Sequence, residues 1–166
     1  MTSRDRLLRL VTWIVIASEA LMFAVLFAAH GGIGVEPPPL ALLAIAVVTG
    51  ALIASCCALA SAVRHARGAR PELVERRLVL AIFLGAGAVV IELAAAMMFT
   101  AAAPLGLVIA GLHAAHVAGA IALAGWVTAL CRGQIRRSRA LGIELVAIYW
   151  YFVTVLWFFV AVLVGG

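Results

Sequence analysis

Five apolar segments, each about as long as a lipid bilayer is thick, take up most of this sequence. A hydrocarbon core about 30 Å thick needs roughly 20 apolar residues per crossing helix. The chain has 166 residues, of which 67% are hydrophobic and only 11% charged, so five crossings with short loops account for nearly all of it. The sequence predicts an all-α, polytopic membrane protein, a single bundle of five transmembrane helices over residues 1–166, with spans near residues 10–29, 40–63, 78–100, 104–131 and 143–164.

The positive charges predict how this bundle is oriented. The chain has no lysine, and its 12 basic residues are all arginine. They lie before the first span, between spans two and three, and between spans four and five, and the other connections have none. Arginine-rich short loops stay in the cytoplasm, so the N-terminus is predicted to be cytoplasmic and the C-terminus outside. This partition explains the net charge of +5 by contact with anionic lipid headgroups, without any nucleic acid.

Cysteine labelling tests this topology. Gly34→Cys and Gly166→Cys, in a background without the native cysteines, should react in intact cells with a reagent that does not cross the membrane. Arg70→Cys, the matched control, should react only after lysis because its loop is predicted to be cytoplasmic. The opposite pattern of labelling would invert the assignment.

Four ionisable residues lie inside the predicted spans: Glu19 in the first, Glu92 in the third, and His113 and His116 in the fourth. Charged groups in a bilayer are costly and call for a partner or a function. With a rise of about 1.5 Å per residue, all four lie at similar depth and can meet inside one bundle. Three interpretations are open: a proton relay, a haem or metal site, or buried pairs that fix helix packing.

The haem or metal interpretation lacks the ligands that it needs. No other span carries a central histidine, since His30 and His65 fall at the edges of loops, and further metal ligands are missing. We therefore expect the isolated chain to bind neither haem nor metal. Glu19 with His116, and Glu92 with His113, are competing candidates for a contact within hydrogen-bonding reach, directly or through one water, and depth alone does not rank them.

Three other features carry structural expectations. Gly111, Ala115 and Gly119 form a row of small residues that should pack closely on a neighbouring helix. Glu144 is expected in the first turn of the fifth helix, where the helix dipole favours a carboxylate. Aromatic residues gather in the fifth span, and Trp150, Tyr151 and Trp157 are expected to pack within the bundle or against a partner or lipid, with Trp157 reaching the outer interface.

No nucleophile paired with a base, no phosphate-binding glycine loop and no redox motif is visible, so we identify no catalytic residue. The three cysteines, Cys56, Cys57 and Cys131, have no metal-binding spacing and are expected to act as small hydrophobic side chains. The residues therefore indicate a small helical membrane subunit with a polar interior.

Three segments give this chain a family resemblance. Residues 13–23 (WIVIASEALMF) contain a Ser-Glu pair before a Met-Phe run, residues 111–117 (GLHAAHV) carry two histidines three apart, and residues 149–157 (YWYFVTVLW) begin and end with aromatic residues. In this order and spacing they resemble three motifs of subunit III of the haem-copper oxidases. The resemblance covers essentially the whole chain and matches the five-helix form of a family that often has seven helices.

The resemblance implies a non-catalytic subunit without redox centres of its own, in a cytochrome c or quinol oxidase of the respiratory chain in the bacterial plasma (inner) membrane. Such a subunit binds the catalytic subunit I, which holds the haem and copper, retains phospholipid and supports proton uptake. Glu19 matches the family's carbodiimide-reactive carboxylate, and His116 matches the histidine near it.

Departures from the family pattern leave the partner enzyme open. Tyr151 and Thr154 stand where the terminal motif has His and Asp, Ala95 stands where a second Glu is common, and Glu92 stands where Gln is common. One alternative is an accessory membrane subunit of a nitric oxide reductase, which belongs to the same family. Another, from a different class, is a small stand-alone channel or transporter that uses Glu19 and Glu92.

Overall fold

The computed structural model describes residues 3–30, 38–68, 70–99, 104–131 and 137–165. Within these ranges there is no strand, and the helices are α1 (Ser3–His30), α2 (Pro39–Arg67), α3 (Pro71–Phe99), α4 (Pro104–Cys131) and α5 (Arg137–Gly165). All five are long and apolar enough to cross a membrane, which confirms the predicted fold class. Gly34 and Gly166, which the topology experiment labels, lie outside the described residues.

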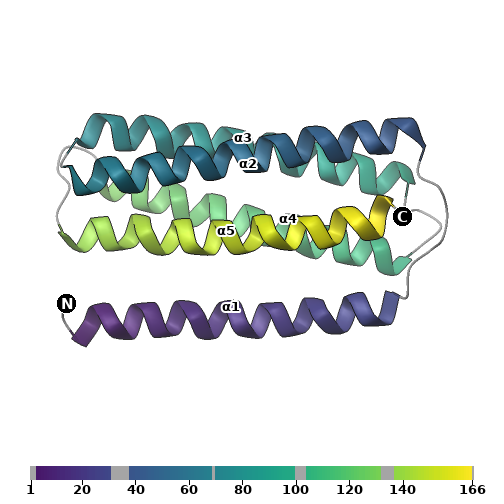
Figure 1. Ribbon diagram of the computed structural model, residues 1–166, viewed down its shortest axis with the longest axis horizontal. Coiled ribbons are helices and arrows are strands. Elements are labelled where there is room, and N and C mark those ends of the chain that lie inside the picture. The colour runs from purple at the N-terminus through teal and green to yellow at the C-terminus, as the bar shows by residue number, and fades with distance from the viewer. Residues whose placement is uncertain (1–2, 31–37, 69, 100–103, 132–136, 166) are drawn as a thin grey trace.

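Four of the helices form a closed ring, and the fifth lies against its outside. In the ring α2 packs on α3, α3 on α4, α4 on α5, and α5 back on α2. The remaining helix, α1, touches only α4 and α5 to any extent and runs along the edge of the bundle (Figure 1). This arrangement makes α2–α5 the structural core and α1 an attached element.

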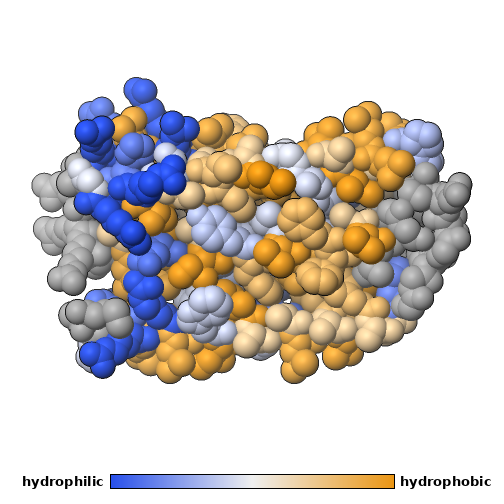
Figure 2. Space-filling view, in the orientation of Figure 1, coloured by the Kyte–Doolittle hydropathy of each residue, from blue (hydrophilic) through white to orange (hydrophobic). Residues whose placement is uncertain are grey.

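The arginine-bearing end of the bundle extends beyond the apolar segments. α1 begins at Ser3, α3 at Pro71 and α5 at Arg137, each several residues before the apolar run that predicted it. Hydropathy detects only the part of a helix that lies in hydrocarbon, whereas arginine and glutamate are good helix formers and continue the helix into the headgroup region. Hydrophilic residues gather at one end of the molecule, and apolar residues cover its middle (Figure 2).

A bidentate ion pair at this end corrects the expectation for Glu144. Because α5 begins at Arg137, Glu144 lies beyond the first turn and gains little from the helix dipole. Instead Arg9 of α1 donates to both of its oxygens, at 3.1 and 2.8 Å, and Arg67 of α2 lies 3.8 Å from it. The planar guanidinium of Arg9 matches the planar Glu144 carboxylate in a two-point contact, so this ion pair explains the position of the carboxylate better than a helix terminus does.

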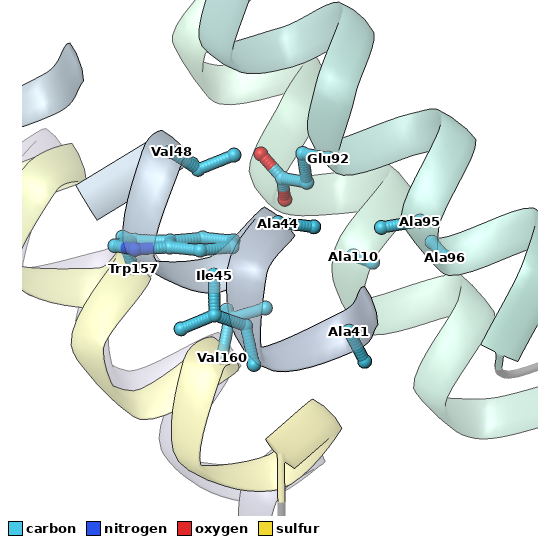
Figure 3. A pocket seen from close by; sticks show the side chains of 10 residues that line it. All are labelled: Ala41, Ala44, Ile45, Val48, Glu92, Ala95, Ala96, Ala110, Trp157 and Val160. Carbon is cyan, nitrogen blue, oxygen red and sulfur yellow. The ribbon is translucent and has the colours of Figure 1, made fainter. Parts of the chain in front are cut away.

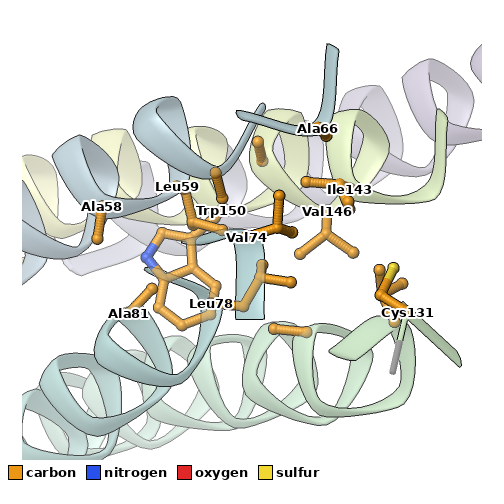
Figure 4. Close-up of a cluster of buried hydrophobic side chains, with 14 of the residues drawn as sticks. Ala58, Leu59, Ala66, Val74, Leu78, Ala81, Cys131, Ile143, Val146 and Trp150 are labelled. Atoms are coloured by element: carbon orange, nitrogen blue, oxygen red, sulfur yellow. The ribbon is translucent and has the colours of Figure 1, made fainter. Parts of the chain in front are cut away.

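Trp150 is the largest side chain in the core at this end of the ring (Figure 4). It is only 1% exposed, and its indole Nε1 donates a hydrogen bond to Ser55 Oγ of α2 at 2.8 Å. The ring packs against Gly85 of α3, where a Cβ atom would lie 2.7 Å from its Cζ2. The expectation of partner or lipid contact is therefore wrong for Trp150, because its indole fills the space that a glycine leaves open.

Trp157 is buried in the same way, one heptad further along α5. It is 3% exposed and donates from Nε1 to Thr49 Oγ1 of α2 at 2.8 Å, so the expectation that it reaches the outer interface is wrong. Tyr151 keeps a partly exposed side chain. The tryptophans that face outward are Trp13 and Trp126, which are 57% and 68% exposed; these are the residues placed to contact lipid or a partner.

The row of small residues on α4 does not pack on a neighbour within the described chain. Ala115 is exposed, and a Cβ atom at Gly111 or Gly119 would meet nothing within 4 Å. The buried face of α4 instead contains His113 and Val117. The polar side chain of His113 needs a partner inside the bundle, so the face of α4 that carries it points inward. The small residues lie on another face of α4, which therefore points outward.

Gly85→Ala should destabilise the ring, because the added methyl group collides with an indole that is enclosed by other helices. Overpacking of this kind costs about 1–3 kcal/mol of unfolding free energy, measurable by unfolding the purified protein in mixed micelles. Gly87→Ala is the matched control, since its Cβ atom meets nothing within 4 Å. Equal stability of the two variants would contradict the close contact with Trp150.

Candidate functional site: two buried carboxyl–imidazole pairs

Glu92 of α3 and His113 of α4 form a buried pair inside the ring. Glu92 Oε1 lies 2.7 Å from His113 Nδ1, and the two side chains are 3% and 0% exposed. The other imidazole nitrogen, Nε2, lies 3.1 Å from the carbonyl oxygen of Val153 on α5. One histidine thus joins three helices of the ring through its two nitrogens.

These partners determine how many protons the pair holds. A carbonyl oxygen only accepts, so Nε2 of His113 must carry a proton. Nδ1 then forms a hydrogen bond with Glu92 only if one further proton lies between them. That proton gives an ion pair when it is on the imidazole and a neutral pair when it is on the carboxyl. Both forms have no net charge, which lowers the cost of placing them in an apolar interior.

An enclosed cavity of about 10 Å³ lies beside this pair. The Glu92 carboxyl forms part of its wall, opposite Trp157, and the rest is apolar and mostly alanine (Figure 3). A volume of this order is about the least that can hold one water molecule. The carboxyl is therefore bounded by His113 on one side and by a small space on the other.

Glu19 of α1 and His116 of α4 form a second pair at the edge of the ring. Glu19 Oε1 lies 3.7 Å from His116 Nε2, and Tyr149 of α5 donates to the same oxygen at 3.3 Å. His116 Nδ1 donates to the carbonyl oxygen of Leu112 at 2.6 Å, which leaves Nε2 facing the carboxyl at a distance too long for a direct hydrogen bond. The side chains are 16% and 19% exposed, less deeply buried than the first pair.

The two pairs are separate. The ring of Phe23 lies against His116 with its centroid 5.3 Å away, and no described hydrogen bond joins one pair to the other. The described geometry therefore does not form a continuous proton relay between the two pairs. Among the described residues no group of three or more His, Cys, Asp or Glu could hold a metal ion.

The geometry brings together the residues that sequence reasoning selected. Glu19 Oε1 lies 3.7 Å from His116 Nε2, near enough for an ion pair and beyond a direct hydrogen bond, and the competing candidates Glu92 and His113 form a pair of their own, so neither arrangement excludes the other. Sequence reasoning missed Tyr149 as a partner of Glu19. Its hydroxyl is one of few in the fifth span, and this scarcity could have marked it. The carbonyl partners Val153 and Leu112 carry no sequence signal, because every residue has a carbonyl group.

Comparison with family models found no match for this chain, and no curated protein matches it. The class that the fold and site define is a multi-pass helical membrane protein with one buried carboxyl–imidazole pair and a second, partly buried one.

Two replacements of Glu92 should separate the contribution of its hydrogen bond to stability from that of its charge. Glu92→Gln keeps a donor for His113 Nδ1 and should be tolerated, whereas Glu92→Leu leaves that nitrogen buried without a partner. An unsatisfied buried group costs about 1–3 kcal/mol, which unfolding of the two purified variants under one condition would reveal. Equal stability of the leucine and glutamine variants would show that this hydrogen bond adds nothing to the fold.

Proposed function

We propose that this chain is a non-catalytic membrane subunit of a haem-copper respiratory complex in a bacterial plasma membrane, oriented with its arginine-bearing end in the cytoplasm. It binds the catalytic subunit, which carries the haem and copper, together with lipid, and supports proton uptake. The chain itself contributes neither redox centre nor catalytic residue.

One observation carries this proposal: the three segments that resemble subunit III motifs come from three different helices and meet. Glu19 of the first motif lies beside His116 of the second and Tyr149 of the third. His113 of the second motif likewise contacts the third, with its ring centroid 5.6 Å from that of Trp157. Residues of the three motifs can act together only if they lie close to one another. Chance matches to these motifs on three separate helices would have no reason to meet.

The buried pairs support a role connected with protons. A carboxyl beside an imidazole can hold a proton on either group, so the pair carries a proton without a net charge. Placed at mid-membrane beside a proton-consuming enzyme, such a pair can hold protons close to the catalytic subunit. The proposal gives this role to Glu19 with His116 and to Glu92 with His113.

The departures from the subunit III pattern have local partners in this chain. Thr154, where the motif has Asp, lies with its Oγ1 3.2 Å from Cys56 Sγ of α2. Tyr151, where the motif has His, lines the same shallow groove between α2 and α5 as these two residues. Because these substituted side chains interact with the rest of the bundle, they favour a divergent branch of the subunit III family. The accessory subunits of nitric oxide reductases belong to that family, so a nitric oxide reductase stays the alternative partner enzyme.

Purification of the tagged chain from native membranes in mild detergent tests the proposal. A larger haem protein should be recovered with it in fixed stoichiometry, with the Soret band of that protein in the reduced-minus-oxidised spectrum. Membranes from cells with the untagged chain are the control. Recovery of the pure chain without haem, together with ion flux when it alone is reconstituted in vesicles, would instead establish a stand-alone channel or transporter.

The same preparation separates the two respiratory alternatives. An oxygen reductase partner should consume oxygen with a quinol or cytochrome c donor, whereas a nitric oxide reductase should consume nitric oxide. Glu19→Gln should be recovered with the partner as efficiently as the unchanged chain, because the glutamine oxygen can still accept from the Tyr149 hydroxyl.

A further inference from the structure

α1 is held to the rest of the protein by unusually few contacts. Its buried residues are only Ile16 and Phe23, and it reaches α4 and α5 but makes no extensive contact with α2 or α3 (Figure 1). In a membrane the apolar surface of a helix is equally well solvated by lipid, so helix association depends on close packing and interhelical hydrogen bonds. Because α1 packs closely on few residues, its attachment to the bundle depends mainly on its polar contacts.

These polar contacts lie at two levels of the membrane. At the arginine-bearing end Arg9 binds Glu144 through both oxygens. At mid-helix Glu19 meets His116 and Tyr149. Further along, the rings of Phe27 and Phe159 stack with their centroids 5.9 Å apart. The middle contact is the one at which an ionisable side chain of α1 meets the ring away from the headgroup region.

That middle contact depends on a proton. Nδ1 of His116 donates to a carbonyl, so Nε2 presents a lone pair to Glu19 Oε1 unless one proton lies on either group. Without that proton a carboxylate faces a lone pair in an apolar region, and the two repel. The second carboxyl oxygen, Oε2, is buried with no hydrogen-bond partner, so the site offers a full negative charge only the Tyr149 hydroxyl.

We propose that α1 is a detachable helix, and that its docking against α4 and α5 requires a proton on either Glu19 or His116. With the proton present, α1 lies against the ring as described. Loss of the proton leaves the carboxylate with too few donors, and α1 turns or moves away so that Glu19 reaches water or headgroups. The groups that face Glu19 are His116 from α4 and Tyr149 from α5.

The other pair lacks this capacity, although its chemistry is the same. Glu92 and His113 lie on helices that are each packed between two ring neighbours, so loss of their proton destabilises the ring but releases no peripheral helix. This contrast makes Glu92 a matched control for Glu19. The inference concerns the chain alone and holds whichever complex it joins, so it can fail while the proposed function stands, and the reverse.

Distance measurement between spin labels tests the proposal with the full chain in lipid nanodiscs. Labels at Val25→Cys of α1 and Val162→Cys of α5 replace side chains that are 62% and 72% exposed, in a background with Cys56, Cys57 and Cys131 changed to alanine. As the pH rises from about 6 to about 10, a second distance should appear. It should be longer by roughly 5 Å, half the diameter of a helix.

Two variants remove the titrating group and should abolish this response. Glu19→Gln keeps a donor for His116 and an acceptor for Tyr149, and Glu19→Met keeps similar volume without polarity. Both should show the same distance at low and high pH. Glu92→Gln and Tyr149→Phe should respond to pH as the unchanged protein does.

Three results would overturn the proposal. The first is an unchanged distance in the parent protein over the whole pH range. The second is a pH response that persists in Glu19→Gln or Glu19→Met, and the third is one that disappears in Glu92→Gln or Tyr149→Phe. The first result would show that α1 does not move. The second and third would show that the proton that controls the movement is not on Glu19 or His116.

Discussion

A polar group in the apolar middle of this bundle must find its hydrogen-bond partner inside the protein, because lipid offers none. This requirement decides how the helices face one another. Contacts between neighbouring helices repeatedly contain a bond of this kind: Glu92 to His113 between α3 and α4, His113 to Val153 between α4 and α5, Trp150 to Ser55 and Trp157 to Thr49 between α5 and α2, and Tyr149 to Glu19 between α5 and α1.

The number and position of the helices could be predicted from the sequence because hydrocarbon thickness imposes a length on every apolar run. The fourth helix, Pro104–Cys131, has the predicted bounds, since a proline and an arginine-rich segment lie at its two ends. The helix starts at Ser3, Pro71 and Arg137 could not be read from hydropathy. They lie where arginine and glutamate continue a helix outside the apolar region, and only hydrogen bonding along the backbone marks the continuation.

The residues of the candidate site could be predicted because a charged group inside an apolar span is costly and therefore needs a partner. Two carboxyls and two imidazoles at similar depth called for partners, but depth alone did not rank the pairings, and only the family resemblance favoured Glu19 with His116. The pattern of small residues at Gly111, Ala115 and Gly119 gave the wrong packing face, because it is a weak preference set against the strong one of burying His113. The sequence could not decide whether Trp150 packs within the bundle or against a partner, and it gave the wrong place for Trp157, since the burial of these indoles depends on a gap opposite Gly85 and on hydroxyls of α2.

The two indoles of α5 have a consequence for how this chain can change over time. Trp150 and Trp157 are one heptad apart and bond to Ser55 and Thr49 of an antiparallel helix, so they act as two pins that set the register of α5 along α2. A slip by one helical turn of about 5.4 Å would break both bonds at once. Mutations at these four positions are therefore expected to be accepted in pairs, and the hydroxyl on α2 should disappear from a lineage only together with the indole that it binds.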